Sequence, residues 1–261
     1  MKRIVETAVE KGQSVGEKIS VVIPAFNEAD YIADTLGSVY ECSESYPGEI
    51  EVVVVDNNST DATAYIARKC GAKVVFEPIN QIARARNTGA KAVTGDYLVF
   101  LDADTTVSGD IFEQVHELLV SGSVIGGGAW TEPNSGWIGR LMFKFLINYP
   151  LFLKNVTVGP FLFCERKAFI EVGGFDEEMY AAEEFSLSDR LKRKGKESGR
   201  RWQIIRSSKT HKIVTSNRKF QKFGGLEMAS HNLHLLWNTQ EKLRHKSQCN
   251  FWYDVRKKHD K

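Results

Sequence analysis

Residues 96–104 read DYLVFLDAD, a short apolar run that leads directly into two carboxylates. Such a run is typical of a strand that is buried on both faces of a parallel sheet. Two comparable runs precede it, ISVVI at residues 19–23 and EVVVV at residues 51–55. The first stops at Pro24, and the second leads into Asp56 and two asparagines. The sequence therefore predicts buried strands whose carboxyl ends carry polar side chains.

Segments with helical spacing of apolar residues separate these strands. We expect helices at residues 29–40, 61–70, 81–93 and 111–120, and further strands at residues 73–76, 123–130 and 202–205. Ser59 or Thr60 is the expected N-cap of the second helix. This alternation predicts an α/β fold with a doubly wound, mostly parallel sheet flanked by helices. In such sheets, ligands bind beyond the carboxyl ends of the strands.

The chain is organised as a single domain with flanking segments. We interpret residues 1–18 as a leader and residues 19–206 as the sheet domain. Residues 207–261 are interpreted as a basic, mainly helical C-terminal extension of the same domain, with a helix expected at residues 225–243.

The composition excludes several classes of protein. Of the 261 residues, 42% are apolar and 26% are charged, which excludes a disordered or collagen-like chain. Four scattered cysteines do not form a disulfide scaffold or a zinc cluster. The N-terminus lacks the apolar region of a signal peptide, and no window reaches the ~18 apolar residues of a spanning helix. We therefore expect a cytoplasmic protein.

Charge is distributed unevenly along the chain. Residues 1–189 hold 15 Lys and Arg and 28 Asp and Glu, a net charge of −13, whereas residues 190–261 hold 20 and 5, a net charge of +15. This asymmetry indicates either a solvated basic tail or an anionic partner. The overall charge of +2 gives no reason to expect a nucleic-acid partner.

An apolar stretch at residues 137–153 contains two basic residues, Arg140 and Lys144, near its start. It predicts an interfacial or acceptor-covering helix, with a helix packed against the sheet as the alternative. Together with the basic C-terminal part, it allows peripheral contact with the inner face of a membrane and a lipid-linked acceptor.

Two carboxylates, Asp102 and Asp104, flank Ala103 directly after the strand at residues 96–101. Side chains two residues apart in an extended chain point to the same side of the backbone. Hard cations such as Mg²⁺ and Mn²⁺ prefer oxygen ligands, commonly one or two carboxylates together with substrate phosphates. The pair therefore predicts a divalent-metal site, with a solvated acidic turn as the alternative.

Six motifs follow one another in a fixed order. They are VIPAFNE at residues 22–28, VVDNNSTD at 54–61, ARARNTG at 83–89, FLDAD at 100–104, GGFD at 173–176 and AEE at 182–184. Leu187 and the pair Arg190-Leu191 follow the last motif. In order and spacing, over roughly residues 19–195, they resemble the family 2 glycosyltransferases with the GT-A fold. The resemblance implies that a sugar passes from a nucleoside diphosphate sugar to the hydroxyl of a glycan or lipid-linked acceptor, with UDP favoured over GDP. It also implies inversion at the sugar and dependence on Mn²⁺ or Mg²⁺.

The resemblance also implies which residues bind the nucleotide sugar. They are Pro24, Ala25, Phe26, Asn27, Glu28, Asp56, Asn58, Arg84, Arg86, Asn87, Gly89, Asp102, Ala103 and Arg218. An Asx turn is the alternative role of Asp56, and packing is the alternative role of Asn87 and Gly89. Because Arg84 and Arg86 lie on different faces of their helix, we expect one to face the ligand and the other to form a surface ion pair.

The catalytic base is expected at the start of a helix. Inverting transfer needs a group that takes a proton from the attacking hydroxyl, and in the resembling family this is usually the Asp of a Glu-Asp pair. Here the pair is Glu183-Glu184. Glu184 aligns with the Asp, and Glu183 is the alternative. His211 is a candidate third metal ligand or a structural residue, and Arg218 could clamp the diphosphate.

Two other functions are weighed against this one. The first is a catalytically weak or dead nucleotide-sugar-binding module, for which the Glu at residue 184 in place of the usual Asp is the support. The second is a nucleotidyltransferase, which usually has a glycine-rich loop with a basic residue after the first strand. The sequence PAFNE at residues 24–28 does not have that pattern.

Overall fold

The computed structural model describes residues 17–149, 152, 159–208 and 210–218. Residues 1–16 of the predicted leader and most of the predicted C-terminal extension, including the helix expected at residues 225–243, lie outside the described residues and stay predictions; Lys18, the last residue of that leader, instead begins the first strand. Within the described ranges, every helix is too short or too polar to cross a membrane.

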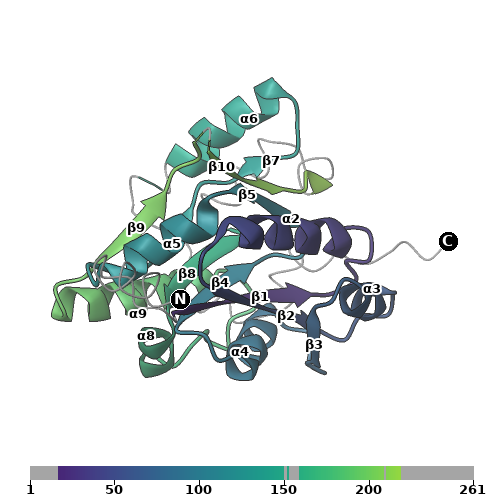
Figure 1. Cartoon of the computed structure of the whole chain (residues 1–261), viewed down its shortest axis with the longest axis horizontal. Helices are drawn as coiled ribbons and strands as arrows, with labels where there is room; N and C mark the ends of the chain where they lie inside the picture. Colours follow the sequence, from purple (N-terminus) through teal and green to yellow (C-terminus); the bar gives the residue numbers. More distant parts are fainter. Residues whose placement is uncertain (1–16, 150–151, 153–158, 209, 219–261) are drawn as a thin grey trace, which may run out of the picture.

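A seven-stranded sheet forms the centre of the domain (Figure 1). Its strands, in spatial order, are β3 (Lys73–Phe76), β2 (Glu49–Asp56), β1 (Lys18–Ala25), β4 (Tyr97–Leu101), β8 (Phe161–Glu165), β6 (Val124–Ala129) and β9 (Arg201–Ile205). β8 runs antiparallel to both of its neighbours, and the other described pairings of this sheet are parallel. The predicted mostly parallel α/β sheet is confirmed.

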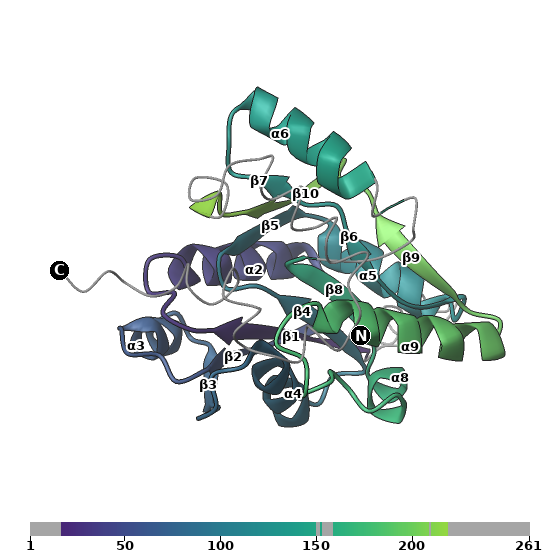
Figure 2. The same cartoon turned by 180° about the vertical axis from the view of Figure 1, so that it is seen from behind.

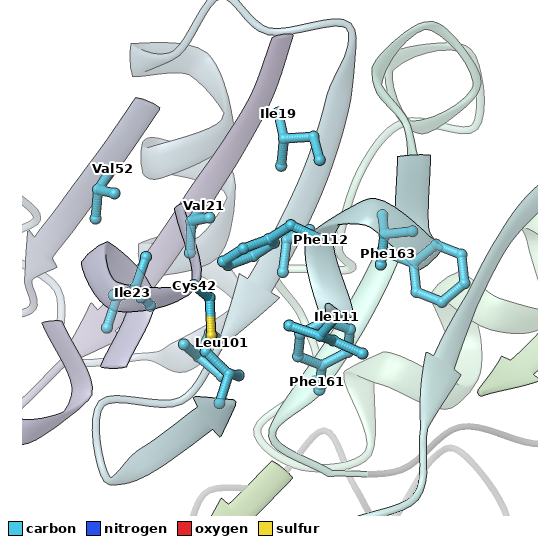
Figure 3. Packing of buried hydrophobic residues seen from close by; sticks show 14 of the residues in the cluster. Ile19, Val21, Ile23, Cys42, Val52, Leu101, Ile111, Phe112, Phe161 and Phe163 are labelled. Atoms are coloured by element: carbon cyan, nitrogen blue, oxygen red, sulfur yellow. The ribbon is translucent and has the colours of Figure 1, made fainter. Parts of the chain in front are cut away.

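Helices cover both faces of this sheet (Figures 1 and 2). They are α2 (Ile32–Ser45) and α5 (Ile111–Val120) on one face, and α4 (Ile82–Ala92), α8 (Arg166–Glu171) and α9 (Glu183–Glu197) on the other. The short helix α3 (Thr63–Lys69) lies next to α2. Because side chains alternate along a strand, Val21 of β1 packs under α2 and α5, whereas Val22 packs under α4. Figure 3 shows part of the first layer, with β1 side chains near Phe112 of α5.

A second, three-stranded sheet follows the carboxyl end of β4. Its strands, in spatial order, are β5 (Thr105–Gly109), β10 (His211–Thr215) and β7 (Glu132–Pro133). After β7 comes α6 (Trp137–Phe143), which continues as a π-helical turn, η1 (Lys144–Asn148). The sequence pattern did not predict this sheet, because its strands are short and several of their residues are exposed.

Pro24 does not end the first strand, contrary to the sequence-based expectation. β1 stays paired with β2 through Ala25, which is in register with Asp56. The carbonyl of Ala25 accepts a hydrogen bond from the backbone N–H of Asn57, so the backbone groups of Ala25 face β2. Successive residues of a strand direct their backbone groups to opposite neighbours, and the nitrogen of Pro24 therefore faces β4. Pairing with β4 has already ended at Val22. The missing N–H of the proline therefore removes no hydrogen bond from the sheet.

The second predicted helix starts later than expected, and neither Ser59 nor Thr60 caps it. α3 begins at Thr63 and has no side-chain cap at its first residue. Ser59 instead accepts a hydrogen bond from the backbone of Asn27 at 3.1 Å. Asp61 accepts one from the backbone N–H of Thr63 at 2.9 Å. The polar residues before α3 therefore tie two loops together, which a local capping rule could not reveal.

Candidate active site

Three polar segments meet at the carboxyl edge of the large sheet. Because β2, β1 and β4 are parallel neighbours, their carboxyl ends lie at the same edge. The segments after these strands contain Asp56, then Asn27 and Glu28, then Asp102 and Asp104. The sequence-based prediction that these side chains gather at one edge is confirmed.

The loops after β1 and β2 hold each other through asparagine and aspartate side chains. Asn27 and Asn58 both have left-handed backbone conformations, with φ of 53° and 64°. The side-chain oxygen of Asn27 accepts a hydrogen bond from the backbone N–H of Thr60 at 2.8 Å. Asp56 accepts one from the N–H of Ser59 at 3.0 Å, three residues on, whereas the predicted Asx turn would bond the N–H two residues on. The same residues therefore shape the loops, and their nucleotide contacts stay predictions.

The small residues of the predicted nucleotide segments are packing residues in this structure. Pro24, Ala25 and Ala103 are buried, and Phe26 is half-buried. The carbonyl of Ala103 accepts a hydrogen bond from the hydroxyl of Thr35 at 2.8 Å. Only backbone atoms or the edge of Phe26 could therefore reach a nucleotide from these positions.

A first cluster of charges joins Arg218 to the carboxylates that follow β1 and β4. One nitrogen of its guanidinium donates to Asp104 at 2.6 Å and to Glu28 at 3.0 Å. The hydroxyl of Ser216 donates to the same Asp104 oxygen at 2.5 Å, and the ring of Tyr31 lies 4.5 Å from the guanidinium. Burial lowers the pKa of Arg218, but the two carboxylates outweigh it and raise that pKa above its usual value.

A second cluster centres on Arg86, whose side chain is only 2% exposed. Its guanidinium donates to Glu183 at 2.5 Å, to Glu184 at 2.8 Å and to Asp102 at 3.0 Å. The ring of Phe175 lies 5.2 Å away. One buried cation therefore links the predicted metal carboxylate after β4 to the predicted catalytic pair at the start of α9.

The two glutamates at the start of α9 differ in exposure, and the pKa of Glu183 is raised. The residue before them, Ala182, has a left-handed φ of 58°, which turns the chain into the helix. The side chain of Glu183 is 3% exposed and that of Glu184 is 12% exposed. Burial and the neighbouring Glu184 raise the pKa of Glu183 to about 8, although Arg86 opposes this. Glu183 is therefore largely protonated near neutral pH, and Glu184 is the more accessible of the two carboxyl groups.

The structure separates the roles of the two arginines on α4. Arg84 points away from the carboxylate cluster and pairs with Glu177 at 2.8 Å and with Glu77 at 3.4 Å. This is the surface ion pair that the helical spacing predicted for one of the two. Asn87 bonds both backbone groups of Phe175 at 2.9 Å, and thus fixes the loop that leads to α9. It is a structural residue here, in agreement with the alternative considered for it.

Gly89 allows α4 to approach the sheet closely. A Cβ atom at this position would lie 2.3 Å from Val22 of β1 and 2.8 Å from Val55 of β2. Contacts this short do not occur, so the residue must be a glycine for α4 to keep its position. Its role in the structure is therefore packing, and through α4 it sets the position of Arg86.

His211 is not brought to the predicted metal carboxylates. It pairs with Gly109 at the far end of β5, whereas Thr215, four residues further along β10, pairs with Thr105 beside Asp104. Four strand residues correspond to about 13 Å. One ring nitrogen of His211 contacts Arg206 O at 2.8 Å, and the other contacts Gln114 at 2.6 Å and Asp110 at 3.1 Å. The structure thus gives His211 a structural role and no role as a third ligand.

The two aspartates suit a hard divalent cation by their chemistry. Asp102 and Asp104 are partly exposed, and each has one oxygen engaged by an arginine, Arg86 or Arg218. In the part of the chain that the structure describes, no set of three His, Cys, Asp or Glu side chains is placed to hold a metal. Mg²⁺ and Mn²⁺ commonly use one or two carboxylates and complete their shell with water and substrate phosphates. The residues present therefore fit an ion that binds together with a diphosphate.

Comparison with known proteins identifies the family. The model of the family described as glycosyl transferase family 2 matches residues 20–173. The chain therefore belongs to the family 2 glycosyltransferases, and it is a transferase. An uncharacterized glycosyltransferase of Mycobacterium bovis is 28% identical over 167 residues, which are 62% of this chain and 73% of that protein. The glycosyltransferase AglE of Haloferax volcanii is 32% identical over 170 residues, which are 60% of this chain and 55% of that protein.

Solved structures, one of them of a mannosyltransferase, share the fold. S. aureus TarS 1–349 in complex with UDP-GlcNAc has a TM-score of 0.60 and 19% identity, and the match covers 91% of this chain and 73% of that chain. The mannosyltransferase PcManGT from Pyrobaculum calidifontis, in complex with GDP-Man and Mn²⁺, has a TM-score of 0.58 and 19% identity, and the match covers 97% of this chain and 81% of that chain. The expected GT-A type of fold is thereby confirmed.

Two residues at the site were not singled out by the sequence. Tyr31 lies beneath the guanidinium of Arg218, and Phe175 lies beside that of Arg86. Phe175 belongs to the GGFD motif at residues 173–176, so its motif was a signal that its side chain borders the site. Tyr31 precedes α2 without any motif, and only the tertiary contact reveals it.

Proposed function

We propose that this glycosyltransferase moves a sugar from a nucleoside diphosphate sugar to an acceptor hydroxyl, with inversion of configuration at the anomeric carbon. A UDP-sugar is the favoured donor, and a GDP-sugar is the alternative. The observation that carries the proposal is the cluster in which Arg86 joins Asp102 to Glu183 and Glu184. In this cluster one terminal nitrogen of the buried guanidinium contacts the two glutamates, and the other contacts Asp102, which supports a metal carboxylate and a base within one site. The structural neighbours with UDP-GlcNAc and with GDP-Man support the two donor classes.

The donor side of the proposed site comprises the loops after β1, β2 and β4. Asn27, Asn58 and Asp56 would face the nucleoside, because amide and carboxylate groups match its hydrogen-bonding groups. Asp102 and Asp104 would hold Mn²⁺ or Mg²⁺, which when bound offsets the negative charge of the departing nucleoside diphosphate. Arg218, which pairs with Asp104 and Glu28 in this structure, would bind the diphosphate.

The acceptor side is the start of α9. In the proposed reaction, the acceptor oxygen forms a bond with the anomeric carbon as the bond from that carbon to the diphosphate oxygen breaks. The hydroxyl proton passes to the carboxylate of Glu184. Glu184 suits this role better than Glu183, because Glu183 is more buried and its raised pKa of about 8 leaves it mostly protonated near neutral pH.

A variant series tests these assignments. We expect Glu184→Gln to abolish sugar transfer while donor affinity changes less than about twofold, since the residue acts on the acceptor. We expect Asp104→Ala to remove the metal-dependent part of donor binding as well as transfer. Glu197→Gln, at the exposed end of the same helix α9, is the matched control and should retain full activity. Near-normal turnover of Glu184→Gln would show that the base is another group.

The donor and the metal are identified by thermal unfolding. We expect one class of nucleoside diphosphate sugar to raise the Tm only when Mn²⁺ or Mg²⁺ is present, because ligand that binds the folded state stabilises it. UDP-GlcNAc and GDP-mannose are suitable first probes. A donor-specific rise without any transfer or donor hydrolysis would favour the dead binding module instead.

We also propose that the acceptor is a glycan or a lipid-linked saccharide and that the protein works peripherally on the inner face of a membrane. The excess of positive charge in residues 190–261 supports this, since the cytoplasmic leaflet is anionic. A panel of soluble and lipid-linked acceptors, assayed with the donor found by thermal unfolding, tests the acceptor class.

A further inference from the structure

One helix carries an unusual share of the exposed apolar surface. Eleven large apolar side chains are exposed among the described residues, and six of them lie on α6, η1 and the residue after η1. These six form what we call the α6 apolar face: Trp137, Ile138, Leu141, Met142, Phe145 and Tyr149. Trp137 alone is 74% exposed. An exposed patch of this kind on a soluble domain indicates a surface that binds a partner.

The six side chains share one side of the helix, and the opposite side is anchored to the protein. Their spacing of three, four or one residue is that of a single helical face. Phe143 lies on the opposite side and is buried. Asn148 is also buried, and its amide donates to the carbonyl of Thr131 at 2.8 Å. The helix is therefore held through its inner side, and the α6 apolar face points outward.

The charge of this segment is uniformly positive. Residues 133–164 contain three Lys and Arg and no Asp or Glu. Two of the three, Arg140 and Lys144, are exposed on the helix itself. The guanidinium of Arg140 is held by the carbonyl of Ser135 at 2.8 Å, and Lys144 lies 5.9 Å from the ring of Trp130. An apolar face rich in aromatic residues and bordered by basic side chains matches an anionic lipid interface.

The same charge argues against two other occupants. A second copy of the chain would bring Arg140 and Lys144 of both protomers together without any acidic residue of this segment to pair with them. Residues 219–261 carry nine Lys and Arg and four Asp and Glu, so they have the same sign of net charge as the helix. Charge complementarity thus favours an anionic surface over either occupant.

The α6 apolar face is also linked to the candidate active site. α6 follows β7, and the backbone N–H of Asn134 donates to the carbonyl of Thr215 in β10 at 2.8 Å. The next residue, Ser216, donates its N–H to the carbonyl of Asp104 at 3.0 Å. Figures 1 and 2 show α6 on the outer side of the small sheet that contains β5, β7 and β10. A surface that α6 contacts would therefore lie on the side of the molecule where this sheet joins the site.

We propose that the α6 apolar face is a membrane-docking surface whose partner is an anionic lipid bilayer. Trp137, Leu141 and Phe145 insert among the lipid acyl chains, and Arg140 and Lys144 contact the phosphate groups. The consequence for the acceptor rests on the proposed function: docking holds the site next to lipid-linked molecules. The docking itself needs neither donor nor metal.

Vesicle flotation with the full chain tests the proposal. The probes are vesicles of phosphatidylcholine alone and vesicles that also contain about 30% phosphatidylglycerol, each at low and high salt. We expect wild-type protein to float with the anionic vesicles at low salt. Leu141→Glu with Phe145→Glu should lower the partition coefficient at least about tenfold, because two apolar side chains are lost from the contact. Arg140→Glu with Lys144→Glu should lower it about fivefold or more per residue.

Ile170→Glu is the matched control, because Ile170 is 58% exposed on α8 and lies outside the α6 apolar face. It should bind vesicles as the wild type does. Brominated lipids should quench the fluorescence of the wild type, and Trp137→Phe should lose most of that quenching. Circular dichroism confirms that each variant is folded.

Three results would overturn the proposal. The first is absence of wild-type protein from anionic vesicles, and the second is wild-type binding by the Leu141→Glu and Phe145→Glu variant, which would place the contact elsewhere. The third is a wild-type dimer without lipid that the same variant converts to a monomer, which would assign the face to a second copy. The donor-dependent rise in Tm, measured in parallel, separates these outcomes from failure of the proposed transferase function.

Discussion

Replacement of Arg86 by methionine would test the charge cluster at the centre of the candidate site. Methionine keeps an unbranched apolar stem but removes the cation that contacts Glu183, Glu184 and Asp102. Removal of one partner from a buried ion pair typically costs about 3–5 kcal/mol, because the remaining charge is left without compensation. Asp102 is 21% exposed, so water screens part of its charge. We therefore expect a loss of about 3 kcal/mol of unfolding free energy at pH 8.

The loss should shrink as the pH falls. Loss of Arg86 removes the charge that opposes protonation of Glu183, so the pKa of Glu183, which is about 8 in the presence of the arginine, rises further. At pH 6 the cluster of the variant therefore holds fewer negative charges than at pH 8. Because Glu183 of the wild type is itself about half protonated at pH 8, we expect the difference between wild type and variant to be smaller at pH 6 by about 0.4 kcal/mol, which corresponds to roughly 0.3 of a pKa unit.

Urea unfolding in the presence of EDTA, followed by circular dichroism at pH 6 and pH 8, measures both effects. Arg84→Met is the matched control, since it lies on the same helix and its side chain is 33% exposed in pairs with Glu77 and Glu177. The Glu177 side chain is 35% exposed, and a pair of this kind contributes at most about 1 kcal/mol, while the buried Glu77 keeps its hydrogen bonds from Ile79 and Thr88 without the arginine. A stability loss for Arg86→Met no greater than that for Arg84→Met, or a larger loss at pH 6 than at pH 8, would refute the role given to this cluster.

Three further predictions follow from individual contacts. Between about pH 5 and pH 8 the folded state holds a proton on Glu183 that the unfolded chain has lost, so this residue makes the free energy of unfolding fall as the pH rises. Glu183→Gln should therefore flatten that part of the stability curve, measured by urea unfolding at several pH values, and an unchanged slope would contradict the raised pKa. Gly89→Ala should destabilise the protein by about 1–3 kcal/mol through a clash with valines of β1 and β2, whereas Gly37→Ala, with open space around it in α2, should be neutral or stabilising in the same assay. His211→Gln should leave intact the part of the donor-induced rise in Tm that depends on Mn²⁺, whereas Asp104→Ala should remove it. Loss of that Mn²⁺-dependent rise in the His211→Gln variant would indicate that His211 is a metal ligand after all.

Local patterns predicted the regular elements well, because apolar runs and helical spacing are properties of neighbouring residues. The strand at Lys73–Phe76 and the helix at Ile111–Val120 have the predicted bounds. The family motifs predicted the GT-A type of sheet, and the ends of parallel strands then placed Asp56 and Asp102 at one edge. Short, half-exposed strands such as β10 have no such local signal, and the small sheet was missed for that reason.

The sequence by itself determined the family, the sheet, and the edge at which the carboxylates gather. The tertiary structure decided which partner each charged side chain has. Arg86 reaches Glu183 across 97 residues of chain, and Arg218 reaches Asp104 across 114, through contacts that exist only when the helices and strands are packed. His211 was assigned by analogy with relatives, and its position on β10 placed it with Asp110 instead. Composition and spacing describe residues that are close in sequence, and they determine the local elements. Ion pairing depends on the distance between side chains in space, and the register of the folded sheets sets that distance.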